Sequence, residues 1–122
     1  MKIIKGTVIH GDKIGKKQGY PTANLSRRVL IYKKLNKGVY VATVELKKRT
    51  YKALLVIGIP GIKKQKKGKV EVYLLNYQGN LYNKKLVVRV YKKLRGIKYY
   101  KHKVALKKQI YKDIQAAKKY FS

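Results

Sequence analysis

Cysteine is absent from the 122-residue sequence, and histidine occurs at only two positions, His10 and His102. Without cysteine the chain can form neither a disulfide framework nor a thiolate zinc site, and it has no thiol nucleophile. Two histidines are too few for a histidine-built metal centre. Any metal ion that the protein uses must therefore be a hard cation held by oxygen ligands.

Acidic residues are almost as scarce, since Asp12, Glu45, Glu71 and Asp113 stand against 33 lysines and arginines. The formal net charge of +29 would attract ATP, RNA, DNA or an acidic membrane surface, and it identifies none of them. Drift in an AT-rich genome explains the lysines as well as selection for binding does. We expect background charge or general electrostatic steering, with no dedicated nucleic-acid partner.

Long apolar runs are also lacking, and no segment approaches the length that a membrane span needs. We expect a soluble, cytoplasmic, monomeric protein without a membrane partner. With 45% hydrophobic residues, the chain can bury a core as one domain over residues 1–122. Met1 directly precedes the first predicted strand, so no upstream domain is expected.

Five segments rich in β-branched and aromatic residues are predicted to be strands. Glycine, proline and asparagine mark the connections between them. Short strands at close spacing are typical of a compact barrel or sandwich. The predicted strands cover residues 2–10, 38–46, 51–59, 69–77 and 85–94.

The end of the chain changes to a helical period. Apolar residues recur there every three or four positions with lysines between them, at Leu106, Ile110, Ile114, Ala117 and Phe121. This spacing predicts an amphipathic helix. We expect its apolar stripe to cover the barrel, because an exposed stripe of that size would promote aggregation. Binding to a membrane surface is the alternative.

The segment from residue 11 to residue 24 reads GDKIGKKQGYPTAN and separates the first two predicted regular elements. Its three glycines, spaced four apart with lysines between, would let backbone N–H groups approach oxyanions closely. It matches neither the P-loop nor the dinucleotide-binding glycine pattern. On spacing alone, a phosphate-binding loop and a mobile connection are equally good interpretations.

The longer stretch HGDKIGKKQGYPTAN closely resembles the signature of bacterial and eukaryotic riboflavin kinases, in which a glycine-rich flap runs into Pro-Thr-Ala-Asn. The family's fold is mainly β, a six-stranded antiparallel Greek-key β-barrel with a C-terminal α-helix. Its activity is Mg²⁺-dependent transfer of the γ-phosphate of ATP to the 5′-hydroxyl of riboflavin, giving FMN and ADP. The resemblance continues in order through Gly38-Val39-Tyr40, Ile57-Gly58, Val70-Glu71-Val72, Leu74-Leu75, Leu81-Tyr82, Leu94-Arg95 and Leu106 to Asp113.

The resemblance also assigns the ATP side of a site. It implies that Thr22 and Asn24 hold Mg²⁺ together with phosphate oxygens, for which a hydroxyl and an amide oxygen are suitable hard ligands. From the residues alone, a turn capped by asparagine after a proline is the alternative. The remaining nucleotide contacts implied by the resemblance are Gly11 and Lys16 beside the phosphates, and Leu74, Asn76 and Tyr82 on the far side.

Glu71 is the one acid within the apolar strand sequence KVEVYLLNY. A carboxylate in a half-buried strand needs a charged or hydrogen-bonding partner, or a functional role. A structural ion pair with a lysine is one explanation. The resemblance implies instead that Glu71 is the general base that accepts the proton of the riboflavin hydroxyl. Phosphoryl transfer depends mainly on positioning and charge neutralisation, so one base, one Mg²⁺ and a glycine-rich flap are sufficient.

On the flavin side, the resemblance places Arg95, Lys98 and Tyr100 in a loop that closes over the isoalloxazine ring. A planar ligand can stack on a tyrosine or a guanidinium. The other acids, Asp12, Glu45 and Asp113, are interpreted as surface, strand and helix charges.

Four positions depart from the family's commonest residues. Tyr73 stands where histidine is usual, Asn76 where aspartate is frequent, Asn83 where glycine is usual and Gly61 where many bacterial members have threonine. None of these departures removes a proposed metal ligand or the base. Two other functions remain open: a basic barrel that binds nucleic acid, and a flavin-binding barrel without turnover.

Overall fold

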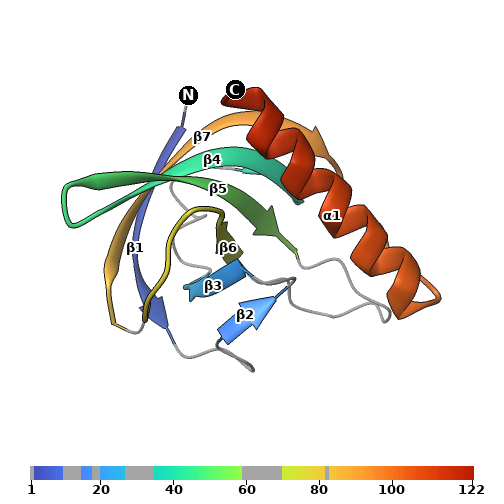
Figure 1. The fold of residues 1–122 in the computed structure, drawn as a ribbon, viewed down its shortest axis with the longest axis horizontal. Helices are drawn as coiled ribbons and strands as arrows, with labels where there is room; N and C mark the ends of the chain where they lie inside the picture. The colour runs from blue at the N-terminus through green and yellow to red at the C-terminus, as the bar shows by residue number, and fades with distance from the viewer. Residues whose placement is uncertain (1, 10–14, 18–19, 27–34, 59–69, 82) are drawn as a thin grey trace.

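The computed structural model describes residues 2–9, 15–17, 20–26, 35–58, 70–81 and 83–122, with the backbone alone for 15–17. Within these residues the chain forms antiparallel strands and one helix (Figure 1). The elements are β1 (Lys2–Ile9), β2 (Gly15–Lys17), β3 (Tyr20–Leu25), β4 (Gly38–Leu46), β5 (Arg49–Ile57), β6 (Val70–Leu74), β7 (Lys85–Arg95) and α1 (Lys103–Tyr120).

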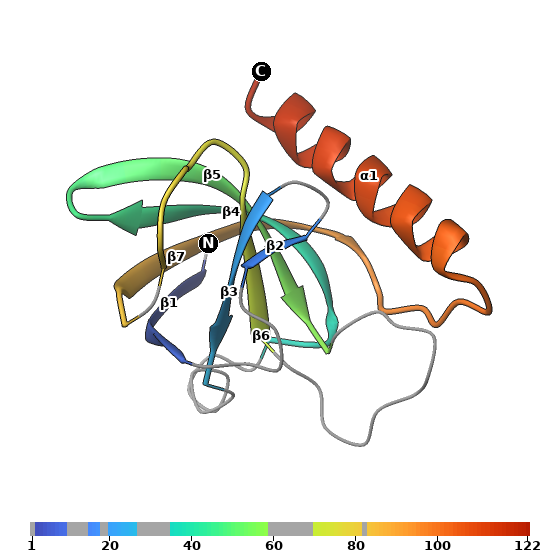
Figure 2. The same cartoon turned by 60° about the horizontal axis from the view of Figure 1, so that its bottom comes forward.

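Six strands close into a barrel-like ring. Hydrogen bonding runs in the order β1, β7, β4, β5, β6, β3, and a pairing between β3 and β1 completes the circle. The short strand β2 attaches to the free part of β3 (Figure 2). The predicted mainly β fold, with six antiparallel strands and a C-terminal helix, is confirmed.

Strand β3 corrects one expectation, because the segment up to Asn24 was predicted to be a loop and residues 20–25 form a strand. Along one edge, β3 pairs with β6. Along the other edge, it pairs first with β2 and then with β1. Pairing on both edges and burial of Ala23 and Leu25 override the local turn signals of proline and asparagine. The alternative interpretation of Asn24 as the cap of a turn is therefore wrong.

Two apolar layers stabilise the fold. The first fills the ring and includes Ile4, Leu55 and Leu74, all fully buried. The second lies between the outside of the ring and α1, where Ile114 and Ala117 are fully buried against β4 and β5. Figure 1 shows α1 lying across one side of the strands. The strands thus bury apolar side chains on both faces wherever the helix covers them.

The helix packs on the strands as the sequence predicted. Ile110, Ile114 and Ala117 are buried, and Leu106 and Phe121 pack against the same cluster at its ends. The apolar stripe is consequently occupied by the strands and not offered to a membrane surface. In the described part of the chain, no helix has the length and apolar character required to cross a bilayer.

We expect Ile114→Ala to lower the free energy of unfolding by about 2–5 kcal/mol, because it opens a cavity between α1 and the strands. Urea unfolding followed by circular dichroism measures the change. The matched control is Val104→Ala on the solvent side of the same helix, where the side chain is 63% exposed. The control should change stability by less than about 0.5 kcal/mol. Equal losses in both variants would show that α1 does not depend on this apolar layer.

Candidate active site

Four polar side chains form a buried block on the outside of the ring. Asn24 of β3 lies directly opposite Glu71 of β6, and Thr22 lies opposite Tyr73. The residues between them point inward to the ring's core, so strand alternation turns these four outward. The exposed fractions are only 2% for Thr22, 5% for Asn24, 2% for Glu71 and 4% for Tyr73. We call these four residues the polar block.

A cross-strand row links the polar block to the end of β7. Glu71 is paired with Val56 of β5, Val56 with Val39 of β4, and Val39 with Arg95. At the usual spacing of neighbouring strands, Glu71 and Arg95 lie no more than about 14 Å apart along the sheet. The fold therefore brings the predicted base, the predicted metal ligands and one predicted flavin contact to the same outer face.

The glycine-rich segment reaches the polar block through β2. Gly15 pairs with Thr22, and Lys16 pairs with Pro21, so the backbone of this segment runs beside the predicted metal ligands. Two residues after Thr22 on β3, Asn24 pairs with Ile9 of β1. The polar block thus lies where β3 changes its partner from β2 to β1. Of the predicted phosphate and nucleotide contacts, Gly11, Tyr82 and the side chain of Lys16 fall outside the described residues.

The amide of Asn24 has an unsatisfied acceptor. Its Oδ1 atom is buried and has no hydrogen-bond partner among the described residues. A buried polar atom without a partner costs about 1–3 kcal/mol, so its retention calls for an explanation. An amide oxygen of this kind is a ligand that a hard cation such as Mg²⁺ accepts, with the Thr22 hydroxyl on the same face. The described residues contain no group of three His, Cys, Asp or Glu side chains that could hold a metal.

Glu71 and Tyr73 are neighbours on the outer face of β6, two residues apart. Burial raises the pKa of Tyr73, and the negative charge of Glu71, a side-chain hydrogen bond to Glu71 and the charge of Asp113 raise this pKa further. The phenol therefore stays protonated. Glu71 is thus a buried acid on the same strand face as the Tyr73 phenol.

The sequence analysis did not predict the contact that Asp113 makes in this region. Its carboxylate accepts two hydrogen bonds from Arg95 Nε, at 3.0 and 3.1 Å, and one from Arg95 Nη2 at 2.7 Å. Gln109 donates a further bond at 3.0 Å. The signal was present in the sequence, because Asp113 interrupts the apolar stripe beside Ile114. This pair fastens the end of β7 to the middle of α1.

A family model described as flavokinase, or riboflavin kinase, matches residues 2–121. The chain belongs to the riboflavin kinase family.

Two relatives and one solved structure agree with this riboflavin kinase assignment. A bifunctional riboflavin kinase/FMN adenylyltransferase from Buchnera aphidicola (subspecies Schizaphis graminum) is 45% identical over 98% of this chain and 38% of its own. An RNA-binding riboflavin kinase from Bacillus subtilis is 30% identical over 99% of this chain and 52% of its own. The chain thus spans well under two thirds of either relative. The crystal structure of riboflavin kinase from Trypanosoma brucei has the same fold, with a TM-score of 0.65 at 22% identity, covering 96% of this chain and 77% of that one.

The other residues predicted for a riboflavin kinase site lie in different surroundings. Leu74 is fully buried inside the ring, on the face opposite to the polar block. Asn76 is exposed, and its Oδ1 accepts a hydrogen bond from the Lys52 backbone N–H at 2.9 Å. Between β7 and α1, the Lys98 ammonium lies 5.7 Å from the centre of the Tyr100 ring. The structure therefore groups Thr22, Asn24 and Glu71, and leaves Leu74 and Asn76 apart from them.

We expect Asp113→Asn to lower the free energy of unfolding by about 3 kcal/mol, because it leaves the largely buried Arg95 guanidinium without a charged partner. Thermal or urea unfolding measures the loss. Glu45→Gln is the matched control, since Glu45 pairs with Arg89 at 2.9 Å while 40% of its side chain is exposed. The control should lose less than about 1 kcal/mol. A similar loss in the two variants would contradict the anchoring role of Asp113.

Proposed function

We propose that this chain is a Mg²⁺-dependent riboflavin kinase that transfers the γ-phosphate of ATP to the 5′-hydroxyl of riboflavin, giving FMN and ADP. The observation that supports it most directly is the pairing of Asn24 with Glu71 in a chain of this family. That pairing sets a carboxylate beside a buried amide oxygen that accepts no hydrogen bond from any described residue. Paired residues in antiparallel strands have Cα atoms about 5 Å apart, close enough for a base and a metal ligand to act on one reacting group.

Glu71 performs the proton transfer in this mechanism. Its carboxylate accepts the hydroxyl proton as the 5′-oxygen bonds to the γ-phosphorus, and the bond from that phosphorus to the bridging oxygen of ADP breaks. ADP leaves with the electron pair of the broken bond. Thr22 and Asn24 would hold Mg²⁺, which supplies charge neutralisation at the phosphates when bound. The burial of Glu71 keeps water away from the proton that moves.

The substrates are held from two sides. The backbone of β2, next to Thr22, approaches the phosphates, with Gly11, Lys16 and Tyr82 as further proposed nucleotide contacts. Lys98 and Tyr100 are proposed for the flavin ring. Arg95 bonds to Asp113 and keeps 17% of its side chain exposed, and we propose that this exposed part faces the flavin.

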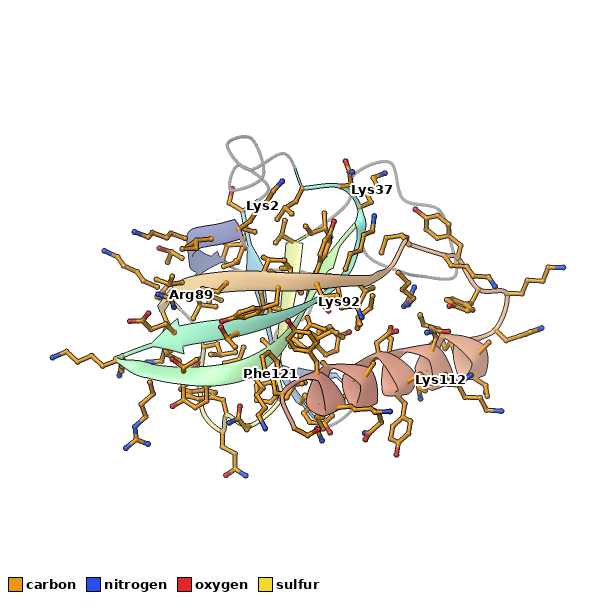
Figure 3. The ribbon with its side chains drawn as sticks, turned by 90° about the horizontal axis from the view of Figure 1, so that it is seen from above. Lys2, Lys37, Arg89, Lys92, Lys112 and Phe121 are labelled. Atoms are coloured by element: carbon orange, nitrogen blue, oxygen red, sulfur yellow. The ribbon has the colours of Figure 1, made fainter. Side chains whose placement is uncertain are left out.

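The basic surface fits general steering of ATP better than a dedicated nucleic-acid site. Figure 3 shows Arg89 and Lys112 on separate parts of the molecule, both away from the side on which Lys2 and Lys37 lie. One relative is described as RNA-binding, so we specify a discriminating measurement. Binding of RNA through phosphate contacts should fall steeply between about 50 and 200 mM salt, while binding of Mg²⁺–ATP in a formed pocket should fall far less.

The assay of Glu71→Gln tests the reaction. The parent protein should form FMN from riboflavin, ATP and Mg²⁺, and the variant should turn over about 10² to 10⁴ times more slowly because it cannot accept the proton. Affinities for riboflavin and Mg²⁺–ATP should stay within about threefold of the parent. Separation of the flavins by chromatography measures the product. A folded parent that forms no FMN would overturn the proposed function, and a fully active variant would remove Glu71 from it.

Asn24→Leu tests the metal site through stability. Mg²⁺–ATP at 100 times its Kd should stabilise the parent protein by about 2.7 kcal/mol, and the Mg²⁺-dependent part of this gain should vanish in the variant. Without ligand, the variant should unfold at nearly the parent's temperature, because the Oδ1 atom that it removes has no hydrogen-bond partner in the described part of the chain. Thermal melting with and without Mg²⁺ measures both. The control is Asn36→Leu at an exposed position, which should keep the full Mg²⁺-dependent shift.

A further inference from the structure

The guanidinium of Arg95 is held by α1 and by its own neighbour in the chain. Its Nε donates to both oxygens of Asp113, at 3.0 and 3.1 Å, and its Nη2 donates to one of them at 2.7 Å. Gln109 of α1 donates to the same carboxylate at 3.0 Å. Nη1 donates to the Gly96 carbonyl at 3.0 Å. The plane of the guanidinium therefore has a fixed orientation at the end of β7.

These contacts leave part of the guanidinium available. Nη1 and Nη2 each carry two N–H groups, and each nitrogen uses one of them, in the bonds to Gly96 and Asp113. No described residue accepts a bond from the other N–H of either nitrogen. Next to Gly96 the space is open, since a Cβ built there would have no described heavy atom within 4 Å apart from its chain neighbours. Two N–H groups on one rigid plane suit two neighbouring acceptor atoms.

The charge of Arg95 is balanced by its partner. The side chains of Arg95 and Asp113 are both largely buried, so water screens the pair only weakly. A triphosphate is attracted chiefly by net positive charge, which a balanced pair does not supply. An uncharged planar ring with acceptor atoms is instead oriented by a few directed polar groups. The available N–H groups therefore fit the flavin better than the phosphates of ATP.

We propose that Asp113 and Gln109 are positioning residues for Arg95: they direct its two available N–H groups at a pair of neighbouring acceptors on the isoalloxazine ring. The inference rests on the proposed function, in which riboflavin is the substrate. Arg95 and Glu71 share the outer face and lie no more than about 14 Å apart along the sheet. The extended ribityl chain spans about 6 Å by its C–C bonds, so one riboflavin can reach Glu71 with its 5′-hydroxyl and Arg95 with its ring.

Arg95→Lys tests the contact, because it keeps the charge and removes the fork of N–H groups. We expect the Kd of riboflavin, measured by the quenching of flavin fluorescence, to rise about tenfold or more. The Kd of Mg²⁺–ATP, measured by thermal shift, should stay within about threefold of the parent. The matched control is Arg89→Lys, which makes the same change at the Glu45 pair on the same strand and should alter neither Kd. An unchanged riboflavin Kd in Arg95→Lys, or an equal rise of the ATP Kd, would overturn the inference.

Gln109→Met and Asp113→Asn test the positioning, because both leave Arg95 in the chain. Measured well below each melting transition, the Kd of riboflavin should rise about threefold in Gln109→Met and about tenfold in Asp113→Asn. In the Arg95→Lys background, neither change should raise it further. If Asp113→Asn does not fold, Gln109→Met decides alone. No effect in the parent background, or an effect that persists undiminished in Arg95→Lys, would limit both residues to a role in the fold and overturn the positioning.

Flavin analogues identify the acceptors. Riboflavin has two neighbouring acceptor pairs, N1 with O2 and N5 with O4, and the 1-deaza and 5-deaza analogues each replace one ring nitrogen by C–H. The parent should bind one analogue about tenfold more weakly than riboflavin, and Arg95→Lys should bind all three flavins alike. Equal binding of the three by the parent would contradict the contact. These measurements need no turnover, so a parent that binds riboflavin and forms no FMN would overturn the proposed reaction and leave the contact to its own results.

Discussion

The register between β3 and β6 is the constraint on which the site depends. Successive residues of a strand point to opposite faces, so a slip of one residue would turn the polar block into the ring and Ala23 or Val72 out of it. Burying four polar side chains inside an apolar core is far more costly than the present arrangement. The requirement to fill the ring with apolar residues therefore also sets Asn24 opposite Glu71. Packing and chemistry are fixed by the same pairing.

The helix α1 increases the burial of the outer face on which the polar block lies. By covering the outer face of β4 and β5, α1 turns that face into a second apolar layer and raises the burial of Tyr73 beside it. The only acid on the buried side of α1, Asp113, is neutralised by Arg95, since an uncompensated buried charge there would oppose docking of the helix. The charge pair and the apolar stripe thus fix α1 in place together.

The sequence could predict those parts of the fold in which the local residues favour a single secondary structure. The strands at 38–46 and 85–94 and the stripe through Ile114 were predicted because their residues favour one structure. Strand β3 was missed, since Pro21 and Asn24 favour turns and only pairing with distant strands extends the chain there. Thr22 and Asn24 were predicted as metal ligands from a family resemblance and not from a local pattern. Their neighbour across the strands could not be predicted, because the register is a property of the assembled ring.

The scarcity of acids leaves few carboxylates. In the described part of the chain, Glu45 pairs with Arg89, Asp113 pairs with Arg95, and Glu71 is buried on the outer face of β6. The surrounding positive charge repels itself and weakens the compact state, so the two apolar layers must supply the stability. At physiological salt, this charge acts over only about 8 Å. Such a charge can raise the rate at which any phosphate ester arrives, including the ATP of the proposed reaction, but it cannot distinguish one phosphate ester from another. In the reaction proposed above, selection of the acceptor hydroxyl would therefore depend on the buried geometry around Glu71.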